Sequence, residues 1–334
     1  GALTARAEVA PEILRILAAA VPATSRAAVL ARVDARLATT EPEFVLEAFP
    51  GLSDDDPGRE IASEVDGFVR RLESGHYFRE VAWDEERREQ RAFGDESWAR
   101  EMDDYLARSA TVAFSGNDLL AAHLYARLLS AFRLAPRTGV FCGPERPDRM
   151  VESDLTEAKR HYLRALYRVV PEEARPSRVL SELISLRDVG DEAFGIADLR
   201  DDDEEVLPDF EAFLARSVAY LEAMGPEDGG REVRRLSREA AALAHGADGL
   251  GALAKRDGGG HAEAWHDWFG ALVRDERLDE ATRVGRQGIS VIADIGYRAR
   301  LGDRLAAVAL RLGDSALAVE AARGAFRARP TELR

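Results

Sequence analysis

Cysteine is almost absent from this chain, since Cys142 is the single one among 334 residues. One cysteine cannot form an intramolecular disulfide, and it cannot build a cysteine-based zinc site. No secretory signal peptide is visible in the sequence, so we predict a reducing compartment and a cytoplasmic location.

Long apolar runs and strand signals are also scarce. The best apolar stretch, residues 13–21, ends at Pro22 and is shorter than the roughly 20 residues that cross a bilayer, which argues against membrane insertion. Alternating strand patterns do not recur, whereas apolar residues at helical spacing recur throughout. Ala, Leu, Arg and Glu dominate, and all four favour helices. The sequence therefore predicts an all-α fold.

The charge is strongly acidic, with a formal net charge of -15 and a pI of about 5.0. Such a chain repels phosphate backbones and anionic membrane surfaces, so we expect neither nucleic acid nor membrane as a general partner. Only Lys159 and Lys255 among the 46 basic residues are lysines. This arginine bias is typical of a GC-rich bacterial genome.

Helical periodicity, turn residues and possible caps predict an ordered series of helices. The expected ranges are 10–21, 24–38, 42–49, 59–74, 77–91, 95–114, 118–133, 154–169, 176–187, 191–199, 208–224, 229–245, 248–255, 261–274, 278–292, 297–311 and 315–328. Residues 135–151 contain three prolines, so we expect an irregular segment there. It divides an N-terminal helical lobe, residues 1–135, from a C-terminal region, residues 152–334.

Small residues in the last third follow the spacing of tetratricopeptide repeats, in which two antiparallel helices cross closely and a proline ends the second helix. Ala318 follows Gly313 by five residues, Ala325 comes seven later and Pro330 five after that. A less regular unit precedes it, with Ala281 and Gly288 at the small positions and Trp265 at the aromatic one. We therefore predict an α-solenoid of antiparallel helix pairs.

A family resemblance rests on short stretches of the same region: residues 277–281 (RLDEA), 297–301 (YRARL), 311–314 (RLGD) and 325–330 (AFRARP). Residues 262–334 resemble the C-terminal helical region of bacterial SWIM zinc-finger proteins and related actinobacterial proteins. The SWIM zinc motif needs three cysteines and a histidine, and this chain has one cysteine. The resemblance therefore implies a tetratricopeptide-like fold and no zinc site.

Signatures of catalysis are missing. No zinc-protease, nucleophile-elbow, dinucleotide or P-loop motif occurs, so we assign no catalytic residue and no cofactor. Cys142 has no nearby group to lower its pKa. We expect the four tryptophans to anchor helix packing, with a ligand-facing patch at Trp265 and Trp268 as the alternative.

A basic stripe lies on the predicted helix from residue 229. Its arginines recur at i, i+3, i+4 and i+7, which places them on one helix face: Arg231, Arg234, Arg235 and Arg238. Such a face can receive an acidic peptide or a phosphate, or it can be a solvated surface paired with neighbouring acids. We take these four residues as the candidate partner-binding site.

An acidic run offers a different chemistry. Asp201, Asp202 and Glu205 fit the spacing D-D-x-x-E, which in all-α terpene synthases holds magnesium and diphosphate. The second metal-binding motif of those enzymes does not follow, and a solvated acidic linker ahead of Pro208 explains the run better.

The sequence favours a non-catalytic interaction or scaffolding module that binds a peptide or protein partner in a solenoid groove. The alternatives are an all-α enzyme or small-ligand-binding protein with a metal-dependent acidic site, and a purely structural oligomer component.

Overall fold

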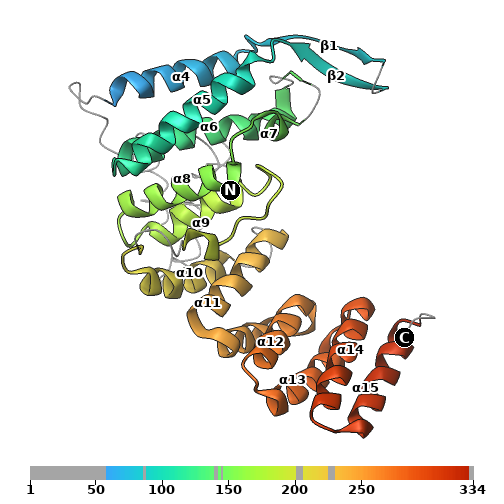
Figure 1. Cartoon of the computed structure of the whole chain (residues 1–334). Coiled ribbons are helices and arrows are strands. Elements are labelled where there is room, and N and C mark those ends of the chain that lie inside the picture. The colour runs from blue at the N-terminus through green and yellow to red at the C-terminus, as the bar shows by residue number, and fades with distance from the viewer. Residues whose placement is uncertain are drawn as a thin grey trace, which may run out of the picture. The chain divides into compact units, whose positions relative to one another are not determined.

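The computed structural model describes residues 58–85, 88–138, 142–143, 146–200, 206–224 and 230–330. Helices make up most of these residues, and the one sheet among them has two strands (Figure 1). The expected helical class is confirmed. The chain divides into two compact units, residues 1–233 and 234–334. The helices expected before residue 50 lie outside the described residues.

The first unit is built from helices packed on one another, together with a two-stranded hairpin. Buried side chains of α4, α5, α6 and α8 form its interior, among them Phe68, Trp98, Tyr125 and Leu163. The elements are α4 (Arg59–Glu73), β1 (Phe78–Asp84), β2 (Glu89–Gly94), α5 (Ser97–Phe114), α6 (Asp118–Thr138), α7 (Pro147–Met150), α8 (Leu155–Val169), α9 (Arg175–Ser185), the short 3-10 turn η2 (Ala197–Leu199) and α10 (Phe210–Met224).

The helix predicted over residues 77–91 is wrong, because β1 and β2 form an antiparallel hairpin there. Tertiary contacts hold its base. The Tyr77 carbonyl accepts hydrogen bonds from Asp95 N at 2.8 Å and from the Cys142 thiol at 3.3 Å. A Cβ at Gly94 would lie only 1.9 Å from that carbonyl oxygen. Local helix propensity is therefore overridden by a close backbone contact that only glycine permits.

Two other element predictions need correction. The helix expected over 191–199 is reduced to η2, residues 197–199. Helix α6 continues through Pro136 to Thr138, beyond the end that we predicted at residue 133. The boundary between the two compact units differs from the one expected between residues 135 and 152, and that division into lobes stays a prediction.

The second unit contains most of α11 (Gly230–Asp257) and then η3 (Gly258–Gly260), α12 (Ala262–Arg274), α13 (Leu278–Val291), α14 (Ile295–Arg311) and α15 (Ser315–Ala328). These ranges agree with the predicted helices to within a few residues. Gly246 interrupts α11 with φ 59° and ψ -142°, so α11 comprises two helices, as the sequence indicated. The Asp294 and Asp314 side chains cap α14 and α15 by accepting backbone hydrogen bonds.

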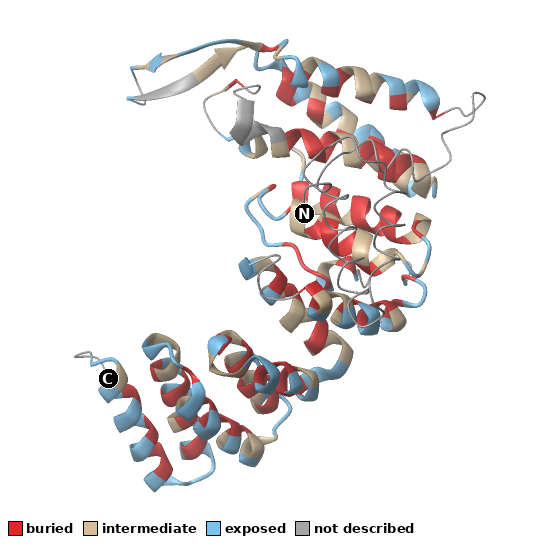
Figure 2. Cartoon of the chain, turned by 180° about the vertical axis from the view of Figure 1, so that it is seen from behind, coloured by how far each residue is buried: buried red, intermediate tan, exposed pale blue. Residues whose placement is uncertain are grey.

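Small residues let the helices of this unit approach closely. A Cβ at Gly288 would lie 2.6 Å from Leu301 Cδ2, and one at Gly302 would lie 3.0 Å from Ala325 Cβ. Trp265, Phe269 and Leu305 fill the same continuous core. Figure 2 shows the buried residues of this unit along the faces where neighbouring helices meet. At these crossings the helices are therefore held by the close packing of small residues and not by large side chains.

Candidate functional site

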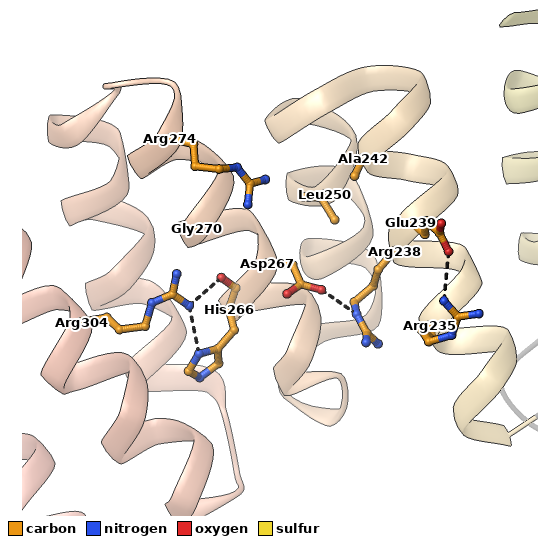
Figure 3. A pocket seen from close by; sticks show the side chains of 10 residues that line it. All are labelled: Arg235, Arg238, Glu239, Ala242, Leu250, His266, Asp267, Gly270, Arg274 and Arg304. Atoms are coloured by element: carbon orange, nitrogen blue, oxygen red, sulfur yellow. Dashed lines mark hydrogen bonds and ion pairs between the residues drawn. The ribbon is translucent and has the colours of Figure 1, made fainter. Parts of the chain in front are cut away.

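A solvent-open cavity of about 330 Å³ lies on the second unit, between α11, α12 and α14 (Figure 3). Charged side chains dominate its lining. Helix α11 contributes Arg235, Arg238 and Glu239. Helix α12 contributes His266, Asp267, Gly270 and Arg274, and α14 contributes Arg304. Four guanidinium groups from three helices therefore surround one space.

The two arginines of α11 are bonded to carboxylates. Arg235 Nη1 donates to Glu239 Oε2 at 3.1 Å, one helical turn away. Arg238 Nε donates to Asp267 Oδ2 on α12 at 2.7 Å, and the Arg238 side chain is only 17% exposed. The charges of Arg235 and Arg238 are therefore balanced within the protein.

Arg238 also belongs to a network that connects α11 with the start of α12. Its Nη1 lies 3.0 Å from His261 Nε2, and His261 Nδ1 lies 3.0 Å from Asp257 Oδ2. Because arginine always donates, His261 accepts at Nε2 and donates from Nδ1 to Asp257. This arrangement assigns Arg238 a packing role as well as a place in the cavity.

Arg304 has a different environment. Its Nη1 donates to the His266 carbonyl at 3.0 Å and lies 3.4 Å from His266 Nδ1, and its guanidinium carbon is 5.1 Å from the Phe269 ring centroid. Burial lowers the pKa of the Arg304 guanidinium; the charge of Asp267 acts against this shift and that of Arg274 adds to it. Among the described residues Arg304 forms no ion pair.

His266 is held in its neutral form by the groups around it. Its Nε2 donates to the Tyr297 carbonyl at 2.9 Å, which leaves the Nδ1 lone pair facing Arg304. Burial lowers the pKa of His266, the hydrogen bond to Tyr297 raises it, and the charges of Arg304 and Arg300 lower it further. A neutral imidazole adds no positive charge to the cavity and accepts a hydrogen bond from Arg304.

Arg274 lies at the end of α12 and is exposed. It forms no hydrogen bond or ion pair with another described residue. Gly270, one turn earlier, makes room for Arg304, because a Cβ there would lie 2.7 Å from Arg304 Nη2. The lining thus has two guanidinium charges, at Arg274 and Arg304, that no ion pair among the described residues balances.

The charge of the whole chain is divided unevenly between the two units. Residues 234–334 contain 17 Arg and Lys against 14 Asp and Glu, which gives a net charge of +3. Since the whole chain carries -15, residues 1–233 carry a net charge of -18. The cavity lies in the unit with the positive charge. The acidic composition that argued against anionic partners therefore does not describe this unit.

The predicted arginine stripe is brought only partly into this cavity. Arg235 and Arg238 line it, whereas Arg231 and Arg234 are exposed and are not among its lining residues. Sequence reasoning missed the lining residues on α12 and α14, among them His266, Arg274 and Arg304. The unusual glycine inside α12, Gly270, was the local signal for a close approach.

The other candidate residues are placed as follows. Asp201, Asp202 and Glu205 lie outside the described residues, and the described residues contain no cluster of metal-ligating side chains.

Burial raises the pKa of the Cys142 thiol. Trp265 and Trp268 are buried against each other, with ring centroids 5.6 Å apart, whereas Trp83 is 54% exposed, so the packing role expected for Trp83 is wrong.

Within the part of the chain that the structure covers, no helix is long and apolar enough to cross a membrane. Fold and cavity together define a predominantly helical protein with an arginine-lined site in its C-terminal unit. No model of a known protein family matches the chain, and a search of curated proteins found no similar sequence.

Proposed function

We propose that this protein is a non-catalytic interaction module, whose C-terminal unit binds an acidic segment of a partner protein in the arginine-lined cavity. The observation that carries the proposal is the convergence of four arginines from α11, α12 and α14 on one open space, two of them without an ion pair in the described residues. Guanidinium groups form strong, directional hydrogen bonds with carboxylates.

The burial of the small residues that the repeat spacing singled out supports this proposal. Ala281, Ala318 and Ala325, which the repeat spacing singled out, are all buried, and Gly288 lies against Trp265 and Leu301. Stacked helix pairs of this kind present a surface that accepts peptides. The proposal includes an α-solenoid arrangement of these pairs and a cytoplasmic location. The resemblance to the helical region of SWIM zinc-finger proteins stays a prediction.

The test is a peptide-library selection against the full chain, followed by fluorescence anisotropy with the selected peptides. We expect enrichment of Asp and Glu. The double variant Arg274→Ala/Arg304→Ala removes the two unbalanced guanidinium groups, and it should weaken binding of the selected peptides by about tenfold or more, since hydrogen bonds to charged groups contribute about 1.5–3 kcal/mol each.

The matched control is Arg323→Ala/Arg327→Ala, which removes the same charge from exposed positions of α15 in the same unit. It should leave peptide affinity nearly unchanged. Selection of basic or apolar peptides, or equal losses in both double variants, would show that the cavity is not the binding site.

A further inference from the structure

Two guanidinium charges without a carboxylate partner remain in the cavity after the internal ion pairs are formed. Glu239 is bonded to Arg235 and Asp267 to Arg238, so both lining carboxylates are engaged. Arg304 bonds only to the backbone and side chain of His266 among the described residues. In Figure 3 Arg304 reaches from α14 to α12, and Arg274 extends toward the same cavity from the end of α12.

Arg274 and Arg304 line the same cavity, and the charge of Arg274 adds to the larger effect of burial in lowering the pKa of Arg304. Repulsion between two like charges is relieved when an anion lies between them. One carboxylate would balance one of these two charges, whereas a dianion would balance both.

We infer that the Arg274–Arg304 pair binds a phosphate monoester dianion. This inference rests on the proposed function and adds the chemical class of the group that enters the cavity. A phosphate monoester carries a charge of about -1.5 to -2 at pH 7 and presents three strong acceptor oxygens. Planar guanidinium groups match this geometry with pairs of parallel hydrogen bonds.

The neutral His266 and Gly270 shape the site for such a group. With its Nε2 proton donated to the Tyr297 carbonyl, His266 fixes Arg304 through its carbonyl and Nδ1 without adding charge. Gly270 leaves the surface of α12 open at the point that Arg304 Nη2 approaches. The guanidinium group is thereby oriented before the ligand arrives, which reduces the entropy lost on binding.

The experiment uses the full chain and three five-residue alanine-based peptides whose central residue is phosphoserine, glutamate or serine, with inorganic phosphate as a fourth probe. Affinities are measured by isothermal titration calorimetry at one ionic strength and about pH 7.5, where the phosphate is largely dianionic. We expect the phosphoserine peptide to bind about tenfold more tightly than the glutamate peptide, and the serine peptide not to bind detectably.

Variants show which residues produce the preference for the phosphoserine peptide over the glutamate peptide. Arg304→Lys keeps the charge and loses the planar fork, so it should remove most of the preference for phosphoserine over glutamate. Arg274→Ala should do the same by removing one of the two charges, whereas Arg323→Ala/Arg327→Ala should leave the preference intact. Circular dichroism of each variant checks that the helices are retained.

The outcomes separate the two proposals. Equal affinity for the phosphoserine and glutamate peptides overturns the dianion inference and leaves the acidic-segment function standing. Failure of the wild-type chain to bind either peptide or phosphate overturns both. If inorganic phosphate binds as tightly as the phosphoserine peptide, the dianion inference holds with a small phosphate compound as its source, and the protein-segment function loses its support.

Discussion

At the scale of single residues, Gly270 determines whether Arg304 can lie against α12. Replacement by alanine would place a Cβ 2.7 Å from Arg304 Nη2 and 3.7 Å from its Cζ. The guanidinium is the far end of a flexible side chain, so it would move away and the helix would remain intact.

For Gly270→Ala we therefore expect weaker binding of acidic or phosphorylated peptides with no loss of stability, because alanine favours a helix over glycine by about 0.5–1 kcal/mol. Gly324→Ala is the control, since Gly324 lies in α15 and a Cβ added there would meet no atom within 4 Å. Calorimetric titration and urea unfolding report the two effects. Unchanged peptide affinity in Gly270→Ala would contradict the role assigned to Arg304.

His266 makes the stability of the second unit depend on pH. Burial lowers its pKa in the folded protein, Tyr297 raises it, and Arg304 and Arg300 lower it, with Asp267 acting in the opposite direction to the arginines. The folded pKa is below the ordinary value of 6.5, so the unfolded chain binds the proton first as the pH falls. The stability that neutral His266 contributes is complete above about pH 6.5 and is lost progressively below it.

We predict that the wild-type chain loses more unfolding free energy between about pH 7.5 and pH 5 than His266→Gln does, since these values bracket the ordinary histidine pKa. Urea unfolding followed by circular dichroism at both pH values measures the difference. Comparing the two proteins cancels the contributions of the other titrating groups. An identical pH dependence for both would show that His266 is not held neutral.

At the scale of the elements, the crossing of α14 and α15 depends on Gly302. A Cβ added there would lie 3.0 Å from Ala325 Cβ and 3.2 Å from the Ala321 carbonyl oxygen. Gly302→Val should overpack this crossing and destabilise the unit by about 1–3 kcal/mol. Ala307→Val, at an exposed position of the same helix, should change stability by less than about 1 kcal/mol, since only helix propensity differs. Chemical denaturation of both variants is the measurement, and similar losses would refute close packing at Gly302.

The β-hairpin shows the opposite relation between local pattern and packing. Residues 77–91 have the composition of a polar helix, yet Tyr77 is 3% exposed and its carbonyl serves both Asp95 and Cys142. Cys142 is distant from Tyr77 in the sequence. Asp95 follows Gly94, and glycine is needed there because the Tyr77 carbonyl approaches closely, which no local sequence pattern indicates. Local propensity is weak, and a few contacts at the base of the hairpin outweigh it.

At the scale of the whole molecule, the chain contains separate hydrophobic cores. The core of the second unit is formed by buried residues between Ala241 and Ala321, and the buried groups of α4, α5, α6 and α8 form the interior of the first. We predict two transitions in differential scanning calorimetry, and Gly302→Val should lower the midpoint of only one. A single transition that shifts as a whole would show that the two units unfold together.

The sequence alone determined the helical class and most helix ranges, because apolar spacing, caps and breaks such as Gly246 are local properties of the chain. It also indicated the small residues at helix crossings and the basic face that contains Arg235 and Arg238. Only the tertiary structure decided that Arg274 and Arg304 share a cavity with them, that the hairpin replaces a helix, and that the positive charge gathers in one unit. Helix periodicity specifies which residues share a face, whereas the meeting of faces on different helices depends on packing between segments far apart in the chain.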